Sequence, residues 1–345
     1  MTDLPSPTQP RSGRPRVFVT RYLPGPALSM LRAAVELVGN VEDRSLSREE
    51  LLAGVPGVDG LLCIPADRID AEVMDAVGPS LRVVSNYAVG YDNIDVPAAT
   101  VRGILVTNTP GVLTETTADL AWTLILGASR RVSEGDALVR RGDFHGIYPT
   151  YMLGRDVHGK TLGIVGMGRI GAAAARRAVG FDMPVLYTRR SGPLPADSAP
   201  AGASWRWCAE LDELLAASDI VSVHVPLAPE TRHLIGAREL GLMRPGSVLV
   251  NTARGAVVDE SALVQALRRG PLGAAGLDVY EHEPRLAEGL AELPNTLLLP
   301  HVGSATVETR GSMAELAARN AIAALRGEPV PHPVNPDVLG RPAGR

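Results

Sequence analysis

The 345-residue sequence has few aromatic residues, only two cysteines and no strong excess of charge of either sign. Phe, Trp and Tyr make up 4% of it, so the core has to be aliphatic, which favours parallel sheets covered by helices over an aromatic-rich sandwich. No run of about 18 apolar residues is present, so we expect no membrane partner. The net charge is -4, and the sequence has no extended cluster of basic residues. Both features argue against a nucleic-acid partner.

The two cysteines, Cys63 and Cys208, lie far apart and lack the spacing of a metal site. We expect two reduced thiols, as in a cytoplasmic protein, with neither a disulfide nor a bound metal. Residues 1–15 are rich in Pro, Ser and Thr and have no apolar segment. They are interpreted as a disordered tail rather than a signal peptide.

Short apolar runs alternate with helical stretches along the rest of the chain. Most of the runs are continuously apolar, which is typical of strands buried on both faces, so the pattern predicts an α/β fold with parallel sheets. The predicted strands are 16–20, 58–63, 81–85, 104–107, 161–165, 184–187, 220–225, 247–251, 274–279 and 296–299.

One stretch without a strand signal, 114–141, predicts a long helix that separates two sheets. Its segment 120–126 is apolar nearly all round, as in helices buried between domains or between subunits. The irregular segment 142–159 is interpreted as an arm that packs on a partner. A terminal helix is predicted over 307–326, followed by a Pro-rich tail.

A glycine-rich turn between the strand 161–165 and a helix over 172–180 is typical of a dinucleotide-binding loop. Its first glycine permits a tight turn, its second admits the pyrophosphate, and its third lets helix and strand pack closely. The phosphates would then bind at the helix N-terminus. The alternative is a purely structural glycine turn. The predicted cofactor-binding residues here are Gly166, Met167, Gly168, Arg169, Ile170 and Gly171.

The next strand, 184–187, predicts which nicotinamide cofactor binds. NAD sites usually carry an acidic residue at the end of this strand. This sequence has Arg189, Arg190 and Ser191 there instead, and guanidinium groups bind phosphate as two-pronged donors. We therefore expect NADP(H) to be preferred. The alternative is that one or both arginines are merely solvated and NAD(H) is accepted.

Six spaced segments resemble the D-isomer-specific 2-hydroxyacid dehydrogenases. They occur in the family's order over about residues 16 to 330, and within the family they are most similar to glyoxylate/hydroxypyruvate reductases. The segments are NYAVGYDNID at 86–95, NTPGVLTE at 108–115, GKTLGIVGMGRIG at 159–171, NTARG at 251–255, GLDVYEHEP at 276–284 and LPHVGS at 299–304.

The resemblance implies two doubly wound parallel-sheet domains, with a Rossmann nucleotide domain inserted into a flavodoxin-like substrate domain. The strand 296–299 and the terminal helix would return to the substrate domain. A homodimer formed through the nucleotide domain is also implied. The expected limits are a tail over 1–15, the substrate domain over 16–111 and 299–330, the nucleotide domain over 112–298 and a tail over 331–345.

Reduction of a 2-oxo acid requires a cation for the carboxylate and carbonyl, a proton donor, and a group that keeps the donor protonated. Arg254, just after the strand 247–251, is the candidate cation, although position alone leaves a structural ion pair equally open. His301 is the candidate acid because it follows a strand in a glycine-flanked loop. His224 lies in an apolar run and is predicted to be packed, and the other histidines to be solvated.

Glu283 is the candidate partner of His301, since a nearby carboxylate favours the charged imidazole. Glu281 is a rival in the same loop, and the resemblance selects Glu283. The resemblance also implies that the N–H groups of Val89 and Gly90 bind the substrate carboxylate. Asp278 is interpreted as orienting the cofactor or the arginine. The remaining residues that the resemblance places near the nicotinamide are Thr117, Thr252, Ala253 and Gly303.

The predicted function is reduction of glyoxylate or hydroxypyruvate to the D-2-hydroxy acid with NAD(P)H, with His301 as proton donor. One alternative is an enzyme of the phosphoglycerate dehydrogenase type, although those usually carry an acid after the second strand. Another is a nicotinamide-sensing binding protein, similar to a corepressor, that does not turn over substrate.

Overall fold

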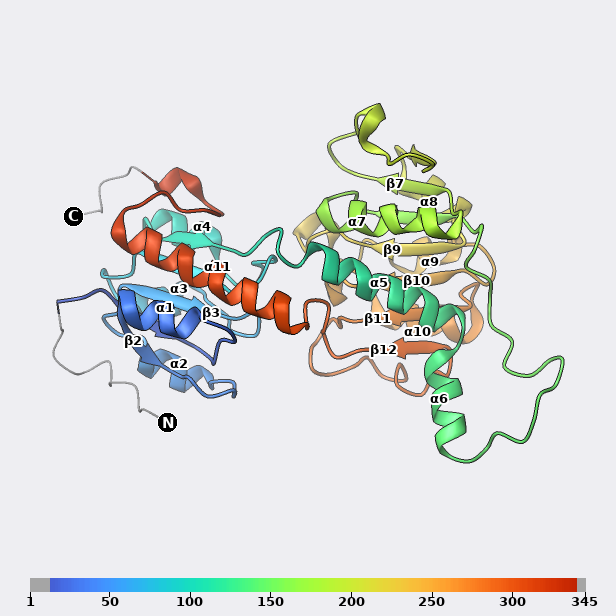
Figure 1. Ribbon diagram of the computed structural model, residues 1–345, viewed down its shortest axis with the longest axis horizontal. Coiled ribbons are helices and arrows are strands. Elements are labelled where there is room, and N and C mark those ends of the chain that lie inside the picture. The colour runs from blue at the N-terminus through green and yellow to red at the C-terminus, as the bar shows by residue number, and fades with distance from the viewer. Residues whose placement is uncertain (1–12, 340–345) are drawn as a thin grey trace. The chain divides into compact units, whose positions relative to one another are not determined.

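A computed structural model describes residues 13–339 of the chain and divides it into two compact units (Figure 1). The inserted unit is Thr114–Ser304, and the discontinuous unit comprises the chain up to Leu113 and from Ala305 onward. Residues 1–12 of the predicted disordered tail and 340–345 of the predicted C-terminal tail lie outside the described residues. No described helix is long and apolar enough to cross a membrane.

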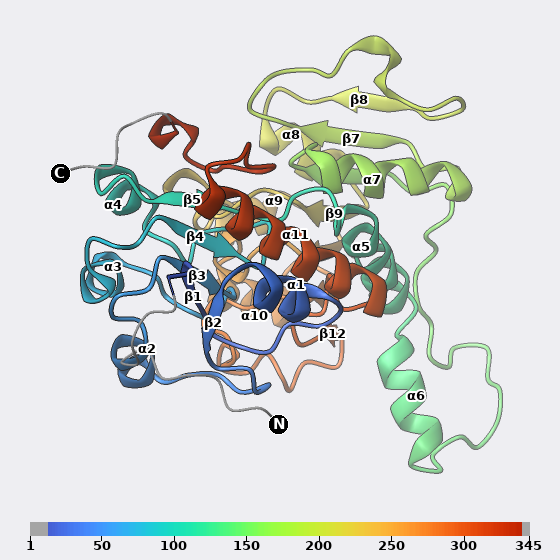
Figure 2. The same ribbon diagram turned by 60° about the vertical axis from the view of Figure 1, so that its left-hand side comes forward.

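The discontinuous unit contains a five-stranded parallel sheet in the order β2-β1-β3-β4-β5, which is the flavodoxin-like order. One face is covered by α1 and α11, which run side by side in Figure 2, and the other by α2, α3 and α4. The strands are β1 (Arg16–Val19), β2 (Glu36–Gly39), β3 (Gly60–Cys63), β4 (Val83–Asn86) and β5 (Leu105–Thr107). The helices are α1 (Ala27–Ala34), α2 (Arg48–Gly54), α3 (Ala71–Val77), α4 (Val96–Val101) and α11 (Val307–Arg326).

The inserted unit contains a seven-stranded parallel sheet in the order β12-β11-β10-β9-β6-β7-β8. The chain reverses its direction of travel across the sheet between β6 and β9, and this switch point is where open α/β sheets bind ligands. The strands are β6 (Leu162–Val165), β7 (Val185–Thr188), β8 (Trp205–Trp207), β9 (Ile220–Val223), β10 (Val248–Asn251), β11 (Ala274–Leu277) and β12 (Thr296–Leu298). The expectation of two parallel-sheet α/β domains is confirmed.

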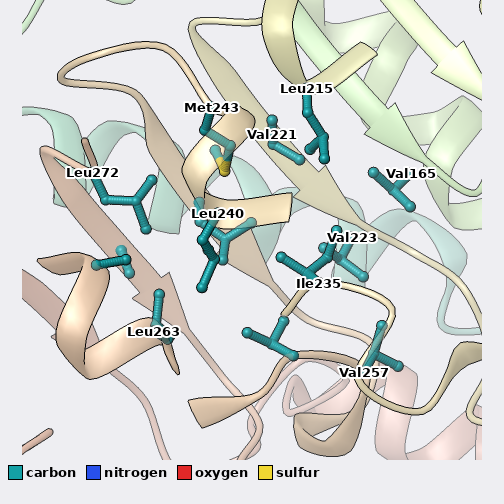
Figure 3. Close-up of a cluster of buried hydrophobic side chains, with 14 of the residues drawn as sticks. Val165, Leu215, Val221, Val223, Ile235, Leu240, Met243, Val257, Leu263 and Leu272 are labelled. Carbon is teal, nitrogen blue, oxygen red and sulfur yellow. The ribbon is translucent and has the colours of Figure 1, made fainter. Parts of the chain in front are cut away.

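Both faces of the seven-stranded sheet are covered by apolar layers. On one face, α5 (Thr114–Ser129) and α7 (Arg169–Arg177) pack on side chains such as Leu162 and Val250. On the other, α8 (Leu211–Ala217), α9 (Ala237–Leu242) and α10 (Glu260–Arg269) enclose the cluster drawn in Figure 3, which includes Leu215 and Val221. Each fully buried Leu or Val contributes roughly 1.5–3 kcal/mol. The continuously apolar strand sequences therefore reflect burial on both faces.

The predicted helix 114–141 is wrong in one respect, because two helices occupy it. After α5 ends, Arg131 takes a left-handed backbone conformation (φ 54°), and α6 (Val132–Arg140) begins there. An arginine in the sequence does not indicate a break between two helices. At this break, Arg131 forms an ion pair with Glu134 of α6 at 2.7 Å. The predicted helix 172–180 also begins earlier, at Arg169, and gives way to a 3-10 turn over Ala178–Phe181.

Two strands were not predicted. β2 follows α1 with one intervening residue, so its apolar residues continue the helical pattern. β8 is an edge strand of three residues that includes the exposed Arg206 and Trp207. Cys63 and Cys208 are both buried and free.

Two expectations about the chain's return to the first domain need correction. The strand 296–299 does not return there, because β12 pairs in parallel with β11 in the seven-stranded sheet, and the units divide after Ser304. The described part of the predicted tail 331–345 packs on the discontinuous unit. There the buried Asn335 accepts a hydrogen bond from the Val106 N–H at 2.7 Å and donates to the Ile104 carbonyl at 3.0 Å.

Candidate active site

The glycine loop follows β6 at the switch point of the seven-stranded sheet. Gly166 has a positive φ of 99°, and a Cβ there would lie 2.9 Å from the His224 carbonyl oxygen. A Cβ at Gly171 would overlap the Gly166 carbonyl, whereas one at Gly168 would meet nothing within 4 Å. The loop is thus closed toward the protein and open at Gly168. α7 begins at once without a side-chain cap, so that, within the described part of the chain, its first N–H groups are left for another acceptor. This geometry fits a pyrophosphate.

Two arginines directly follow β7. Arg189 is half-buried and Arg190 and Ser191 are exposed. No ion pair joins either guanidinium to another group among the described residues, although Arg176, Arg206 and Arg238 of the same unit each form one. Both cations are therefore available to an external anion.

His301 and Glu283 form the ion pair that the sequence predicts. The imidazole Nδ1 lies 2.8 Å from Glu283 Oε2, and the Tyr280 N–H donates to Oε1 of the same carboxylate at 3.0 Å. Burial pushes the pKa of Glu283 upward, but the hydrogen bond and charge of His301 outweigh it, with a smaller contribution from Arg254, so the pKa is lowered. The carboxylate fixes the Nδ1 proton and leaves Nε2 facing away from Glu283.

The rival carboxylate has other partners. Glu281 Oε1 lies 2.7 Å from His233 Nε2 and accepts a hydrogen bond from Arg232 at 3.1 Å. Glu281 and Glu283 are two residues apart, and their side chains point to different neighbours. Of the two, Glu283 is therefore the carboxylate that contacts His301.

Asp278 holds the loop that carries His301. Its carbonyl accepts the His301 N–H at 2.8 Å, and its two carboxylate oxygens accept the N–H groups of Val302 at 2.7 Å and Gly303 at 2.8 Å. Asp278 is buried, which raises its pKa. His301 has a left-handed φ of 54°, which this set of bonds maintains. The sequence predicts that Asp278 orients the cofactor or the arginine, whereas in the structure its carboxylate holds the loop of His301.

Arg254 follows β10 in a turn that the side chain of Asn251 holds by two hydrogen bonds. Asn251 Nδ2 donates to the Arg254 carbonyl at 2.9 Å, while Asn251 Oδ1 accepts the Ala253 N–H at 3.0 Å. Because β10, β11 and β12 are neighbours in one parallel sheet, the loops with Arg254, Glu283 and His301 leave the same edge. Asn251 had not been predicted as a site residue.

The residues predicted near the nicotinamide gather at this edge. A Cβ at Gly303 would lie 3.1 Å from Asp278 Oδ2 and 3.5 Å from Thr117 Cγ2. The hydroxyl of Thr252, next to Ala253, is buried and has no hydrogen-bond partner among the described residues. An orphaned hydroxyl together with an open glycine loop fits a polar ligand such as a dinucleotide.

His224 was predicted to be packed inside the strand 220–225, but β9 ends at Val223 and His224 follows it at the switch point. Its Nε2 lies 2.9 Å from Ser222 Oγ, and burial lowers its pKa to about 4. The ring is therefore neutral near pH 7.

Val89 and Gly90 lie in the discontinuous unit, in the loop after β4, and both are partly exposed. Asn108 Nδ2 donates to the Val89 carbonyl at 2.8 Å, and Asn86 Nδ2 donates to the Gly90 carbonyl at 2.7 Å. The N–H groups of Val89 and Gly90 donate to no acceptor among the described residues.

Comparison with known proteins identifies the family of this chain. A family model described as D-isomer specific 2-hydroxyacid dehydrogenase, NAD binding domain, matches residues 122–303. The glyoxylate reductase of Thermococcus gammatolerans is 51% identical over 330 residues, which cover 94% of this chain and 97% of that protein.

The chain belongs to the D-isomer specific 2-hydroxyacid dehydrogenases.

Two solved structures are similar to this dehydrogenase over nearly its whole length. A glyoxylate reductase from Paecilomyes thermophila is similar with a TM-score of 0.83 and 36% identity, over 94% of this chain and 99% of that one. An NADPH-dependent glyoxylate/hydroxypyruvate reductase from Sinorhizobium meliloti, solved with NADP and malonate, gives a TM-score of 0.81 and 36% identity, over 93% and 97%.

Gly255, which sequence reasoning did not single out, brings two of the dehydrogenase's loops together. A Cβ there would overlap the backbone of Tyr280 and Glu281. We expect Gly255→Ala to force the Arg254 and Glu283 loops apart and to lower turnover about 100-fold, the cost of misplacing catalytic groups by about 1 Å. Turnover is followed by nicotinamide absorbance.

The matched control is Gly241→Ala in the same unit, where a Cβ meets nothing within 4 Å. Its turnover should equal that of the unchanged protein. Normal turnover of Gly255→Ala would show that the two loops do not depend on this close approach.

Proposed function

We propose that the protein reduces a small 2-oxo acid, glyoxylate or hydroxypyruvate, to the D-2-hydroxy acid with NAD(P)H, and that His301 is the proton donor. The observation that carries this proposal is the 2.8 Å contact between His301 Nδ1 and Glu283, beside Arg254. The relatives named glyoxylate reductase support the substrate class. Neither a phosphoglycerate dehydrogenase nor a nicotinamide-sensing binding protein is favoured by these relatives.

The reaction breaks the carbonyl π bond and forms one C–H and one O–H bond. The cofactor, when bound, supplies the hydride for the carbonyl carbon. Arg254 holds the substrate carboxylate and polarises the carbonyl oxygen, because its guanidinium is always charged. His301 gives its Nε2 proton to the oxygen as negative charge develops there. Glu283 stabilises the imidazolium before this transfer and keeps the ring oriented.

Substitution of His301 tests the proposal. His301→Ala should lower kcat by about 100-fold to 10,000-fold, the usual contribution of general acid catalysis, and leave the dissociation constant of NADPH nearly unchanged. Turnover with glyoxylate and hydroxypyruvate and fluorescence titration with NADPH measure the two effects.

The control is His158→Ala, which removes an exposed histidine of the same unit that pairs with Asp182. It should behave as the unchanged protein. Equal losses of turnover and cofactor affinity in His301→Ala would reject the assignment of His301. Cofactor binding without turnover over a panel of 2-oxo acids would favour the binding-protein alternative.

We further propose that NADP(H) is preferred over NAD(H). The support is that neither Arg189 nor Arg190, which follow β7, forms an ion pair with another residue that the structure describes, and that the sequence has no acid there. The Sinorhizobium meliloti relative is named as NADPH-dependent. Arg189, Arg190 and Ser191 would contact the 2′-phosphate, while the loop from Gly166 to Gly171 would hold the pyrophosphate.

A double substitution tests this preference. Hydrogen bonds to charged groups contribute about 1.5–3 kcal/mol, so Arg189→Ala with Arg190→Ala should raise the KM for NADPH by about tenfold or more and leave that for NADH unchanged. Steady-state kinetics with both cofactors measure this. Arg244→Ala, which removes an exposed arginine paired with Asp219, is the control. Equal rises for both cofactors would contradict the assignment.

We also propose a homodimer in which a second copy covers α6 and the segment after it. Figure 2 shows both standing away from the seven-stranded sheet, and α6 has no buried residue. Large apolar side chains are exposed along them, a pattern that marks protein interfaces. They are Val132, Val139, Phe144, Ile147, Tyr148 and Leu153.

Charged substitutions on this surface test the dimer. Ile147, which is 92% exposed, should be buried in a dimer, so Val139→Asp with Ile147→Asp should shift the mass in solution from dimer to monomer. Light scattering after size-exclusion chromatography measures the mass. Val101→Asp, at an 86% exposed valine of the other unit, is the control. A monomeric unchanged protein would rule the dimer out.

A further inference from the structure

The loop after β4 is fixed through its carbonyl groups. The Ala88 carbonyl accepts the Thr109 N–H at 2.8 Å, the Val89 carbonyl accepts Asn108 Nδ2 at 2.8 Å, and the Gly90 carbonyl accepts Asn86 Nδ2 at 2.7 Å. Three consecutive carbonyls are thus bonded to the protein. The N–H groups of the three peptides that they belong to, those of Val89, Gly90 and Tyr91, have no acceptor among the described residues.

Peptide geometry links these two facts. In a trans peptide the C=O of one residue and the N–H of the next point in opposite directions. A donor that holds the Val89 carbonyl therefore sets the direction of the Gly90 N–H, and a donor that holds the Gly90 carbonyl sets that of the Tyr91 N–H. Successive N–H groups turned outward form a concave site for an anion.

The two asparagines that hold these carbonyls are themselves held. The Asn108 carbonyl accepts a hydrogen bond from Asn320 of α11 at 2.9 Å. Asn86 is fully buried, and its Nδ2 also donates to Asn93 Oδ1 at 3.2 Å. Asn93 in turn donates to the Asp67 carbonyl at 3.0 Å. The donors therefore belong to a connected polar network.

We propose that Asn108 and Asn86 are positioning residues for the substrate carboxylate. Asn108 holds the peptide whose N–H, that of Gly90, would bind the carboxylate, and Asn86 holds the next peptide and so fixes the shape of the loop. This inference rests on the proposed function and on the role that the family resemblance implies for Val89 and Gly90, whose N–H groups would bind the substrate carboxylate. Asn108 orients the Gly90 N–H, and Asn86 orients the Tyr91 N–H and closes the loop. Neither side chain needs to touch the substrate.

Asn108→Leu tests the inference because leucine keeps the approximate shape and cannot donate. The KM for glyoxylate should rise about tenfold or more, and the inhibition constant of oxamate, a carboxylate-bearing analogue, should rise by the same factor. The dissociation constant of NADPH should not change, and kcat should change less than KM. Asn86→Leu should shift the same two constants in the same direction.

The matched control is Asn335→Leu, which removes a buried asparagine of the same unit that clasps β5 instead. It should lower the melting temperature and leave KM for glyoxylate unchanged. If Asn108→Leu does not fold, Asn108→Ser takes its place, since a hydroxyl is too short to reach the Val89 carbonyl.

An unchanged protein that reduces no 2-oxo acid would reject the proposed function. An active protein whose KM and oxamate inhibition are unaltered in the folded Asn108 variant would overturn this inference alone. Equal changes in KM for Asn108→Leu and Asn335→Leu would also overturn it, because the effect would then reflect general loosening of the unit.

Discussion

Parallel strand pairing is the constraint on which the site of the inserted unit depends. Because all strands of the sheet run the same way, the chain leaves β10, β11 and β12 at one edge. In the sequence, Glu283 lies 29 residues after Arg254 and His301 lies 47 residues after it. Their loops nevertheless emerge from adjacent strands. The backbone hydrogen bonds between these strands therefore do more than stabilise the sheet, since they set the spacing of the loops that carry the guanidinium, the carboxylate and the imidazole.

Short polar side chains then determine the conformation of the loops, whose backbone groups are not paired in a β-sheet. Asp278 accepts two N–H groups of the His301 loop, and Asn251 bonds both a carbonyl and an N–H of the Arg254 turn. In the other unit Asn86 and Asn108 hold carbonyls of the Val89–Gly90 turn. The same physical device recurs: a fixed amide or carboxylate at a strand end orients the backbone of a loop.

Much of the fold could be predicted from the sequence because burial on both faces produces continuous apolar runs. Prediction failed where that signal was weak or shared. β2 continues the apolar pattern of α1, and β8 is a short, exposed edge strand. The break at Arg131 depends on a local conformation that arginine seldom adopts, and the pairing of β12 with β11 depends on contacts between distant segments. The pairing of β12 with β11 is a tertiary effect that no local window of the sequence contains.

The candidate site, like the fold, could be predicted from the sequence only in part. The two glutamates of the loop after β11 show the reason. Sequence spacing alone could not separate Glu281 from Glu283, since both follow the same strand. The pKa of Glu283 is lowered because the charge and hydrogen bond of His301 outweigh burial, whereas burial raises the pKa of Asp278. The carboxylate of Asp278 accepts two N–H groups of the loop that carries His301, whereas that of Glu283 contacts the imidazole itself and accepts one N–H group. Residue type alone therefore does not determine what a carboxylate in this site contacts. The positions of the neighbouring hydrogen-bond donors determine it.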